Sequence, residues 1–354
     1  MRDQQDLSGS TANPTIGSGT STSETLDPRT SLPAYPDGWF AAAMSSEIPA
    51  GGVLGRRIFG KDVVVCRSES GVLGVFDALC PHLGANLAVG GTVLGEHLEC
   101  PFHRFRFDFD GECVQSYGAE HPCSGRLGLH EVDEVNGTVF VRNNLSGRPS
   151  AWKIPAMEDN GWTPLRFRRW HLHTHPQEVH ENAPDVGHLR RLHGFVIDDF
   201  EVSAEGERFY SSYRSRKPGG VLGVGSKPLE LDITGYIAGL GFAVTNVHLL
   251  ALGITSRIFT MTTPTDPGEL DLTIAMSMRS LSESRLNRVT RLAPERLVFA
   301  LSHILVAGLL KASAKEVDKD TGIWEHKGYL PQPRLAIGDG PILKYRTWAK
   351  QFYA

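Results

Sequence analysis

Two short segments of this 354-residue sequence each carry one cysteine and one histidine at close spacing. Cys80-Pro-His82 is followed by Cys100-Pro-Phe-His103. Structural zinc sites usually take a pair of cysteines or a pair of histidines from each arm, whereas each segment here mixes the two ligand types. A two-iron, two-sulfur cluster with two thiolates on one iron and two imidazoles on the other needs this mixture. Because neutral imidazoles raise the reduction potential of such a cluster, the pattern predicts an electron carrier.

A second group of possible metal ligands lies in a histidine-rich segment further along the chain. Residues 181–194 are predicted to form a short helix with Asn182 as its N-cap residue. Asp185 and His188 are three residues apart, which places them on one face of a helix. His193 lies five positions beyond His188 and can join it only where the helix ends or distorts. Two histidines and a carboxylate on one face of a metal form a ferrous site with positions open for oxygen.

The carboxylate that would complete this site is expected near the end of a long apolar helix, predicted from about Pro294 to Val317. Four acidic residues lie there, and their spacing does not choose among them: Glu316, Asp318, Asp320 and Glu325.

The cysteine- and histidine-bearing segments resemble the two cluster-binding loops of the Rieske oxygenases. The similarity covers Cys80-Pro-His82-Leu-Gly-Ala-Asn and Cys100-Pro-Phe-His103. One position departs from the family pattern, since Phe105 stands where tryptophan is common. The resemblance implies a Rieske 2Fe–2S cluster held by these two cysteines and two histidines.

The histidine-rich segment resembles the catalytic iron motif of the same family, in the pattern Asn-x-x-Asp-x-x-His-x4-His. The segment that begins at Asp320 resembles the family's Asp-x-x-Ile-Trp, which carries its carboxylate ligand. The resemblance implies that His188, His193 and Asp320 bind one mononuclear non-heme Fe(II). It also implies that Asp185 links an iron histidine to a cluster histidine of a neighbouring subunit, and that Asn182 lies beside the iron.

Within the family, the sequence is most similar to the cholesterol 7-desaturase and 3-ketosteroid 9α-hydroxylase branch. This implies a terminal oxygenase, a head-to-tail homotrimer, that uses O2 and electrons from a separate NAD(P)H reductase or ferredoxin. The reaction would hydroxylate or desaturate a C–H bond of a bulky hydrophobic, steroid-like substrate. Two alternatives stay open. One is a biosynthetic oxygenase that acts on a pyrrole or indole natural product by oxidative cyclisation or amine oxidation, and the other is a plain Rieske electron-transfer protein.

The elements that must position these residues divide the chain into three parts. Residues 1–33, rich in Ser, Thr, Gly and Pro, are predicted to be a disordered leader. Short apolar runs punctuated by glycine predict an all-β Rieske domain over 34–148. Residues 149–354 are predicted to form the catalytic iron domain, a central antiparallel sheet covered by helices, so the fold class is α+β. The uncharged segment 233–256 and the apolar helix 297–310 are the expected walls of a substrate pocket.

Composition excludes several other classes of protein. The net charge of -4 lacks the basic excess of a nucleic-acid binder. No membrane span is expected, because the uncharged segment is rich in glycine and β-branched residues, which favours two strands and a turn. Five cysteines is an odd number and no secretion signal is evident, so we expect a cytoplasmic protein in which Cys66, Cys113 and Cys123 are ordinary thiols.

Overall fold

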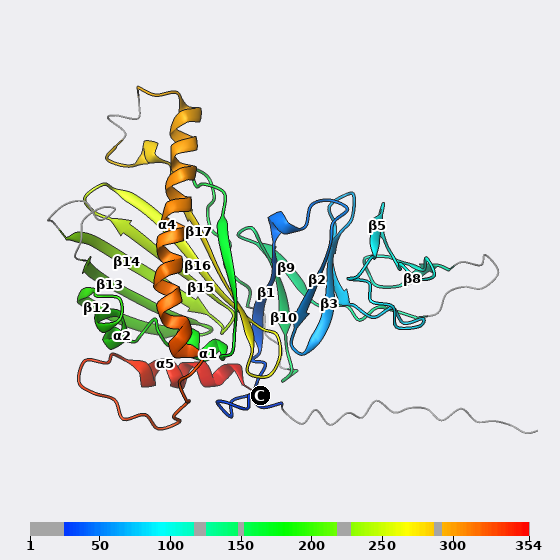
Figure 1. The fold of residues 1–354 in the computed structure, drawn as a ribbon, viewed down its shortest axis with the longest axis horizontal. Coiled ribbons are helices and arrows are strands. Elements are labelled where there is room, and N and C mark those ends of the chain that lie inside the picture. The colour runs from blue at the N-terminus through cyan, green and yellow to red at the C-terminus, as the bar shows by residue number, and fades with distance from the viewer. Residues whose placement is uncertain (1–24, 117–124, 148–151, 218–227, 287–291, 354) are drawn as a thin grey trace, which may run out of the picture.

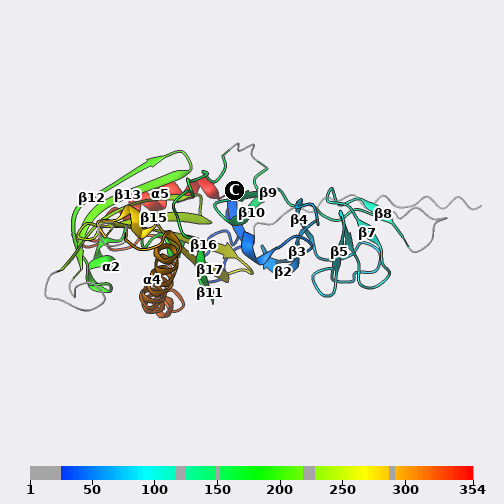
Figure 2. The same ribbon diagram turned by 90° about the horizontal axis from the view of Figure 1, so that it is seen from above.

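The computed structural model describes residues 25–116, 125–147, 152–217, 228–286 and 292–353. The chain forms a small lobe of short strands and a larger lobe built on one wide sheet (Figure 1). The view from above shows the same two lobes side by side along the longest axis (Figure 2). The α+β class predicted from sequence is confirmed.

The part of the small lobe nearest the large lobe consists of two three-stranded antiparallel sheets. One has the order β1-β10-β9 and the other β2-β3-β4. Alternate apolar side chains of these strands close a shared core that includes Val63, Val75 and Val139. The strands are β1 (Gly38–Met44), β2 (Val53–Ile58), β3 (Lys61–Arg67), β4 (Leu73–Asp77), β9 (Val132–Val135) and β10 (Thr138–Asn143).

The outer part of the small lobe is a four-stranded sheet in the order β5-β6-β7-β8. Its core contains Cys80 and Cys100 together with Leu87, Leu98 and Phe107. The cysteine- and histidine-bearing segments follow β4 and β6 in the chain. The strands are β5 (Thr92–Leu94), β6 (His97–Glu99), β7 (Arg106–Phe107) and β8 (Cys113–Gln115).

The large lobe is a seven-stranded antiparallel sheet in the order β11-β17-β16-β15-β14-β13-β12. The uncharged segment 233–256 lies in β14, β15 and the start of β16, which confirms its prediction as strands. The strands are β11 (Arg166–Leu172), β12 (Val196–Glu205), β13 (Arg208–Lys217), β14 (Leu229–Ala238), β15 (Phe242–Leu249), β16 (Ile254–Pro264) and β17 (Leu270–Met278).

Helices cover the large sheet and close its lower end in Figure 1. Helix α4 crosses one face of the sheet, and two short helices follow β11. The helices are α1 (Pro176–His180), α2 (Val186–Arg191), α4 (Glu295–Trp324) and α5 (Ile342–Ala349), with short 3-10 turns η1 (Ser45–Glu47), η2 (Leu281–Glu283) and η3 (Lys350–Phe352).

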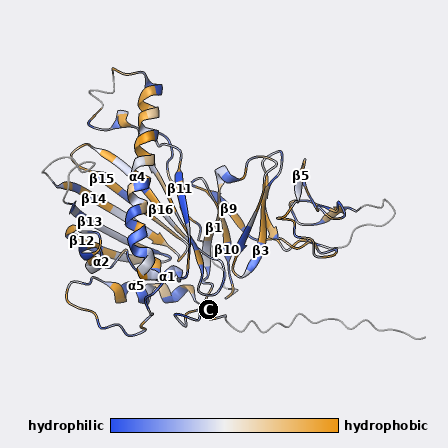
Figure 3. Cartoon of the chain, in the orientation of Figure 1, coloured by the Kyte–Doolittle hydropathy of each residue, from blue (hydrophilic) through white to orange (hydrophobic). Residues whose placement is uncertain are grey.

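Helix α4 is the one helix of the described residues that is long and apolar enough to cross a membrane, and 22% of its most apolar window is buried. Its N-terminal half is strongly apolar and its C-terminal half is mixed (Figure 3). Length and composition alone are weak evidence for a span, because a helix that packs in a protein core passes the same test. The C-terminal end of α4 does pack on the sheet, where Trp324 contacts Leu172 and Leu272.

Two expectations from the sequence need correction. Residues 25–33, assigned to the disordered leader, are placed and packed: Asp27 is buried, and Arg29 donates to the carbonyl of Glu325 at 2.5 Å. Residues 1–24 and the predicted 148/149 domain boundary lie outside the described residues. Cys113, expected to be a free thiol, is disulfide-bonded. Cys66 is a free buried thiol as predicted, and Cys123 lies outside the described residues.

Candidate active site

The two cysteine- and histidine-bearing segments fold into loops of the same backbone design. In the first, the N–H of Gly84 donates to the carbonyl of Cys80 at 2.9 Å; in the second, the N–H of Arg104 donates to the carbonyl of Cys100 at 3.1 Å. The donor has a positive φ in both, +73° for Gly84 and +60° for Arg104. Glycine takes this conformation freely, whereas arginine does so at a cost. We call residues 80–84 and 100–104 the cluster loops.

The four predicted cluster ligands divide into an inner and an outer pair. Cys80 and Cys100 are buried free thiols, and burial raises the pKa of Cys80. His82 and His103 are half-buried, with ring centroids 4.7 Å apart in an edge-to-face arrangement. The ring of Phe105, which stands in the family's tryptophan position, stacks on His82 at 4.4 Å. Thiolates inside and imidazoles near the surface would place the histidine-bound iron closest to an electron-transfer partner.

Three predicted iron ligands meet in the large lobe. Ligand atoms of His188, His193 and Asp320 all lie within 4.8 Å of one another. Asp320 Oδ1 is 3.2 Å from His188 Nε2 and 3.4 Å from His193 Nε2, and the two Nε2 atoms are 2.9 Å apart. We call these residues the facial triad. The structure thus brings together the three residues that the resemblance implied, although two segments more than a hundred residues apart supply them.

The facial triad has the chemistry of a metal-binding site rather than of a settled polar cluster. Asp320 is buried, yet its Oδ1 has no hydrogen-bond partner among the described residues. A buried carboxylate oxygen that accepts no hydrogen bond is costly, and here both imidazole Nε2 atoms lie within 3.4 Å of it without serving as aligned donors. A divalent cation bound between the three groups would remove this cost. Two histidines and one carboxylate are the ligand set of non-heme Fe(II) oxygenases.

Helix α2 is shorter than predicted, and its early end is what brings His188 and His193 together. Its N-cap is Asp185, not Asn182, and Asp185 Oδ1 accepts from the backbone N–H of His188 at 2.8 Å. The helix ends at Arg191, so the chain can turn His193 back toward His188. Burial raises the pKa of the Asp185 carboxyl. The bridge predicted for Asp185 between an iron histidine and a neighbouring cluster histidine stays a prediction.

The other acidic residues near the end of α4 have other partners. Asp318 Oδ1 accepts from Trp170 Nε1 at 2.9 Å, and the Glu325 carboxylate lies 3.8 Å from His173. Glu316 points toward the facial triad, but its Oε2 lies 2.9 Å from His193 Nδ1, on the far side of that ring from Asp320. Sequence reasoning considered Glu316 only as a possible metal ligand and missed its contact with His193. The place of Glu316 one helical turn before Asp320 was the available signal.

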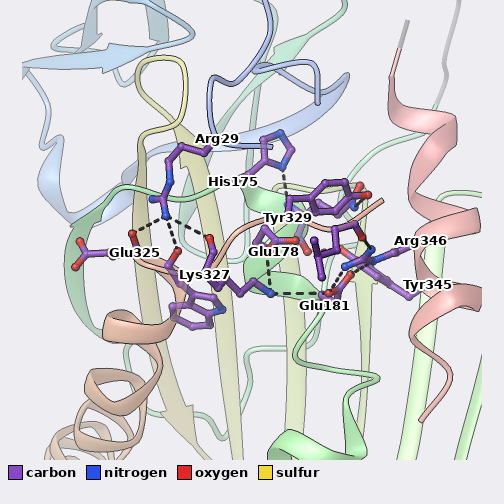
Figure 4. Close-up of polar contacts among 12 residues, drawn as sticks. Arg29, His175, Glu178, Glu181, Glu325, Lys327, Tyr329, Tyr345 and Arg346 are labelled. Atoms are coloured by element: carbon purple, nitrogen blue, oxygen red, sulfur yellow. Dashed lines mark hydrogen bonds and ion pairs between the residues drawn. The ribbon is translucent and has the colours of Figure 1, made fainter. Parts of the chain in front are cut away.

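A buried charged network fixes α1 and therefore the segment that leads to α2 (Figure 4). Arg346 Nη2 from α5 donates to Glu181 Oε1 at 2.8 Å, and Lys327 Nζ lies 2.8 Å from Glu178 Oε2. The Tyr345 hydroxyl, also from α5, donates to the carbonyl of Gln177 at 3.1 Å. The C-terminal segment thus holds α1 in place, directly before the residues that form the facial triad.

A cavity of about 220 Å³ lies beside the facial triad. Asn182 lies on its wall together with the facial triad, and its predicted place beside the iron stays a prediction. The sheet contributes Ile233 and Ala243 to the wall, as predicted for segment 233–256. The prediction for 297–310 is wrong for this cavity, because the residues that α4 contributes lie further along: Val317, Asp320 and Trp324.

Comparisons with known proteins identify both lobes. The sequence model of the Rieske [2Fe-2S] domain family matches residues 38–126. The sequence model of the 3-ketosteroid 9alpha-hydroxylase C-terminal domain family matches residues 141–353. Cholesterol 7-desaturase from Ciona intestinalis is 31% identical over 91% of this chain and 69% of its own length. The oxygenase component of 3-ketosteroid-9-alpha-monooxygenase from Rhodococcus rhodochrous is 26% identical over 93% of this chain and 86% of its own length.

Solved structures show the same fold at lower identity. The crystal structure of dicamba monooxygenase bound to dicamba has a TM-score of 0.63 and 17% identity, over 90% of this chain and 97% of that one. NdmA from Pseudomonas putida CBB5 has a TM-score of 0.62 and 17% identity, over 88% of each chain. With a Rieske domain joined to a matching catalytic domain, the chain belongs to the Rieske oxygenases, in the family of the 3-ketosteroid 9α-hydroxylase C-terminal domain, and is an oxidoreductase.

Proposed function

We propose that this chain is the terminal oxygenase of a Rieske-type system that oxidises a C–H bond of a bulky apolar, steroid-like molecule. The oxidant is O2, and the electrons come from a separate NAD(P)H reductase or ferredoxin. The cluster loops would hold the 2Fe–2S cluster and the facial triad one Fe(II). The observation that carries the proposal is the facial triad beside a partly apolar cavity, in which the buried Asp320 Oδ1 accepts no hydrogen bond from the described residues.

The substrate class rests on the relatives and on the cavity wall. The relatives carry names that refer to cholesterol and to a 3-ketosteroid. The wall includes Ile233, Leu272 and Ile274, which suit a hydrocarbon surface. A volume of about 220 Å³ is below the roughly 300–1,000 Å³ of pockets that enclose a drug-sized ligand. The cavity therefore fits the reacting part of a four-ring molecule rather than the whole of it.

Each residue of the site has a separate role in the proposed reaction. When bound, the iron supplies the position at which O2 accepts electrons. Asp320 would contribute one negative charge to the metal and the two imidazoles two neutral donors, a ligand set that leaves coordination positions for O2. The apolar wall of the cavity excludes water and protects the reaction from wasteful proton and electron loss. Asn182 offers a polar group at the same wall.

The arrangement of the lobes supports electron transfer between chains. Strands β5 and β8 mark the far end of the small lobe, whereas α2 lies at the opposite end of the molecule (Figures 1 and 2). A head-to-tail homotrimer would bring one chain's cluster loops to a neighbour's α2. The exposed side chains beside the cluster histidines suit such a contact: Leu83 is 66% and Phe102 62% exposed. Asp185 would lie at this junction.

Metal analysis and product analysis test the proposal together. The purified protein should be brown and contain about three irons per chain, two in the cluster and one in the facial triad. Asp320→Ala should lose only the third iron, while the exposed control Asp318→Ala keeps all three. With a reductase and NADH, a panel of steroids should yield oxidised product. Product from alkylated pyrroles or indoles instead, or a protein without the third iron, would contradict the proposal.

A mixing experiment tests transfer between chains. Cys100→Ser removes a cluster ligand and Asp320→Ala an iron ligand, so each variant alone should be inactive. Co-expressed in one cell, the two should form mixed trimers in which an intact cluster faces an intact iron site on the next chain, and part of the activity should return. Inactive mixed trimers would show that transfer runs within one chain. Asp185→Asn should keep all three irons but slow the oxidation of the reduced cluster severely.

A further inference from the structure

Helix α4 presents two carboxylates, one helical turn apart, to the histidines of the facial triad. Asp320 faces the Nε2 atoms of both histidines, and Glu316 faces the opposite nitrogen of one of them. The distance from Glu316 Oε2 to His193 Nδ1 is 2.9 Å, which is a normal hydrogen bond. His193 thus lies between two carboxylates from the same helix, whereas the backbone of His188 is held by the Asp185 cap.

Glu316 is itself held by two cations. Lys217, the last residue of β13, places Nζ 2.9 Å from Glu316 Oε1, and Lys319 places Nζ 2.8 Å from Oε2. The Lys217 ammonium also lies 4.9 Å above the ring of Phe195, two residues beyond His193. Sheet, helix and the loop after α2 therefore meet at this carboxylate, which restricts its position.

We propose that Glu316 is a positioning residue for the iron centre. A carboxylate can only accept, so His193 donates from Nδ1 to Glu316, and a metal at the facial triad would take the Nε2 lone pair of the neutral ring. The contact fixes the tautomer and ring orientation of His193 and makes it a stronger donor to the metal. Lys217 keeps the carboxylate in place from the sheet side. The inference rests on the proposed iron centre and assigns Glu316 a role that does not include binding the metal.

The test measures iron affinity, independently of turnover. The mononuclear site is emptied with a chelator while the cluster is retained, and Fe(II) is titrated back against a competing chelator. Glu316→Ala should weaken Fe(II) binding about 10- to 100-fold, the usual cost of losing such a partner of a ligating histidine. Glu316→Gln, whose amide oxygen can still accept from Nδ1, should recover part of that affinity. Asp318→Ala removes a carboxylate from the same helix without touching His193 and should bind Fe(II) like the wild type.

The electron paramagnetic resonance spectrum of the nitric oxide adduct of the Fe(II) site provides a second readout. Its rhombicity should change in Glu316→Ala and not in Asp318→Ala, because only the former frees the His193 ring. Cluster absorption and the melting temperature confirm that each variant is folded. Wild-type affinity and spectrum in Glu316→Ala, or equal losses in the Ala and Gln variants, would overturn the inference. Wild-type protein that binds no Fe(II) at this site would instead overturn the proposed function.

Discussion

Gly340 lies far from the iron ligands in the sequence, but it touches the segment that positions them. It has φ +94°, and a Cβ atom there would lie 2.2 Å from the carbonyl oxygen of Pro184 and 3.1 Å from the backbone N of Val186. That same N–H donates to the carbonyl of Asp339 at 3.0 Å. Pro184 and Val186 flank Asp185, so Gly340→Ala should displace the residue that caps α2.

The expected magnitude has two parts. A non-glycine residue at positive φ costs about 1–2 kcal/mol of stability. The Cβ must also separate from the Pro184 oxygen by about 0.8 Å to reach the 3.0 Å below which real Cβ contacts essentially never occur. A misplacement approaching ~1 Å at a catalytic group can cost about 100-fold in rate. We therefore expect Gly340→Ala to slow oxidation of the reduced cluster by one to two orders of magnitude.

Gly338→Ala is the matched control. Gly338 has nearly the same φ, +98°, but a Cβ there would meet nothing within 4 Å. Both variants should lose similar stability from backbone strain in thermal unfolding, and only Gly340→Ala should lose stopped-flow cluster oxidation in the presence of O2 and substrate. If both variants transfer electrons at the wild-type rate, or both slow equally, the packing of this segment against Pro184 does not position Asp185.

Three further predictions concern stability. Arg346→Met leaves the buried Glu181 carboxylate without its closest cation and should cost about 3 kcal/mol in chemical unfolding; an unchanged midpoint would contradict this. Burial opposes ionisation of Glu99, but hydrogen bonds from Arg104 and Arg106 hold its pKa below 4.5, so the stability it contributes is present above pH 4.5 and lost as the pH falls through the folded pKa. Glu99→Gln should reduce this loss, so its melting temperature should fall less than that of the wild type as the pH is lowered. Removing iron should lower the melting temperature, and Fe(II) at 100 times its Kd should restore about 2.7 kcal/mol, whereas Asp320→Ala should show no such recovery.

The cluster loops were predictable because their ligands are local. Four ligands within one short stretch leave few other interpretations, and the structure places them as two equivalent loops. Strands 233–256 were predictable because glycine and β-branched residues disfavour the alternative helix. The end of α4 was missed because its last turns become polar while they remain helical, so the apolar pattern stops near Val317 and the helix continues to Trp324.

The rest of the site depends on contacts that sequence does not encode locally. Spacing could not choose Asp320 from its acidic neighbours, since helix rotation against the sheet decides which of them faces the histidines. Asn182 and Asp185 are both good N-cap residues. The helix begins after Asp185, where Pro184 precedes the cap and the N–H of Val186 donates to the carbonyl of Asp339 in the distant C-terminal segment. Packing of residues 25–33 was missed because Arg29 binds backbone carbonyls, which leave no trace in composition.

Both ends of the described chain converge on α1. The Tyr353 hydroxyl donates to Gln177 Oε1 at 2.8 Å, and His175, the N-cap of α1, contacts the carbonyl of Pro33 through Nε2 at 3.0 Å. Protein engineering of this oxygenase must therefore respect both contacts. A purification tag or a fused reductase joined directly after Tyr353 would begin beside the hydroxyl that holds α1, so its linker has to leave this hydrogen bond intact.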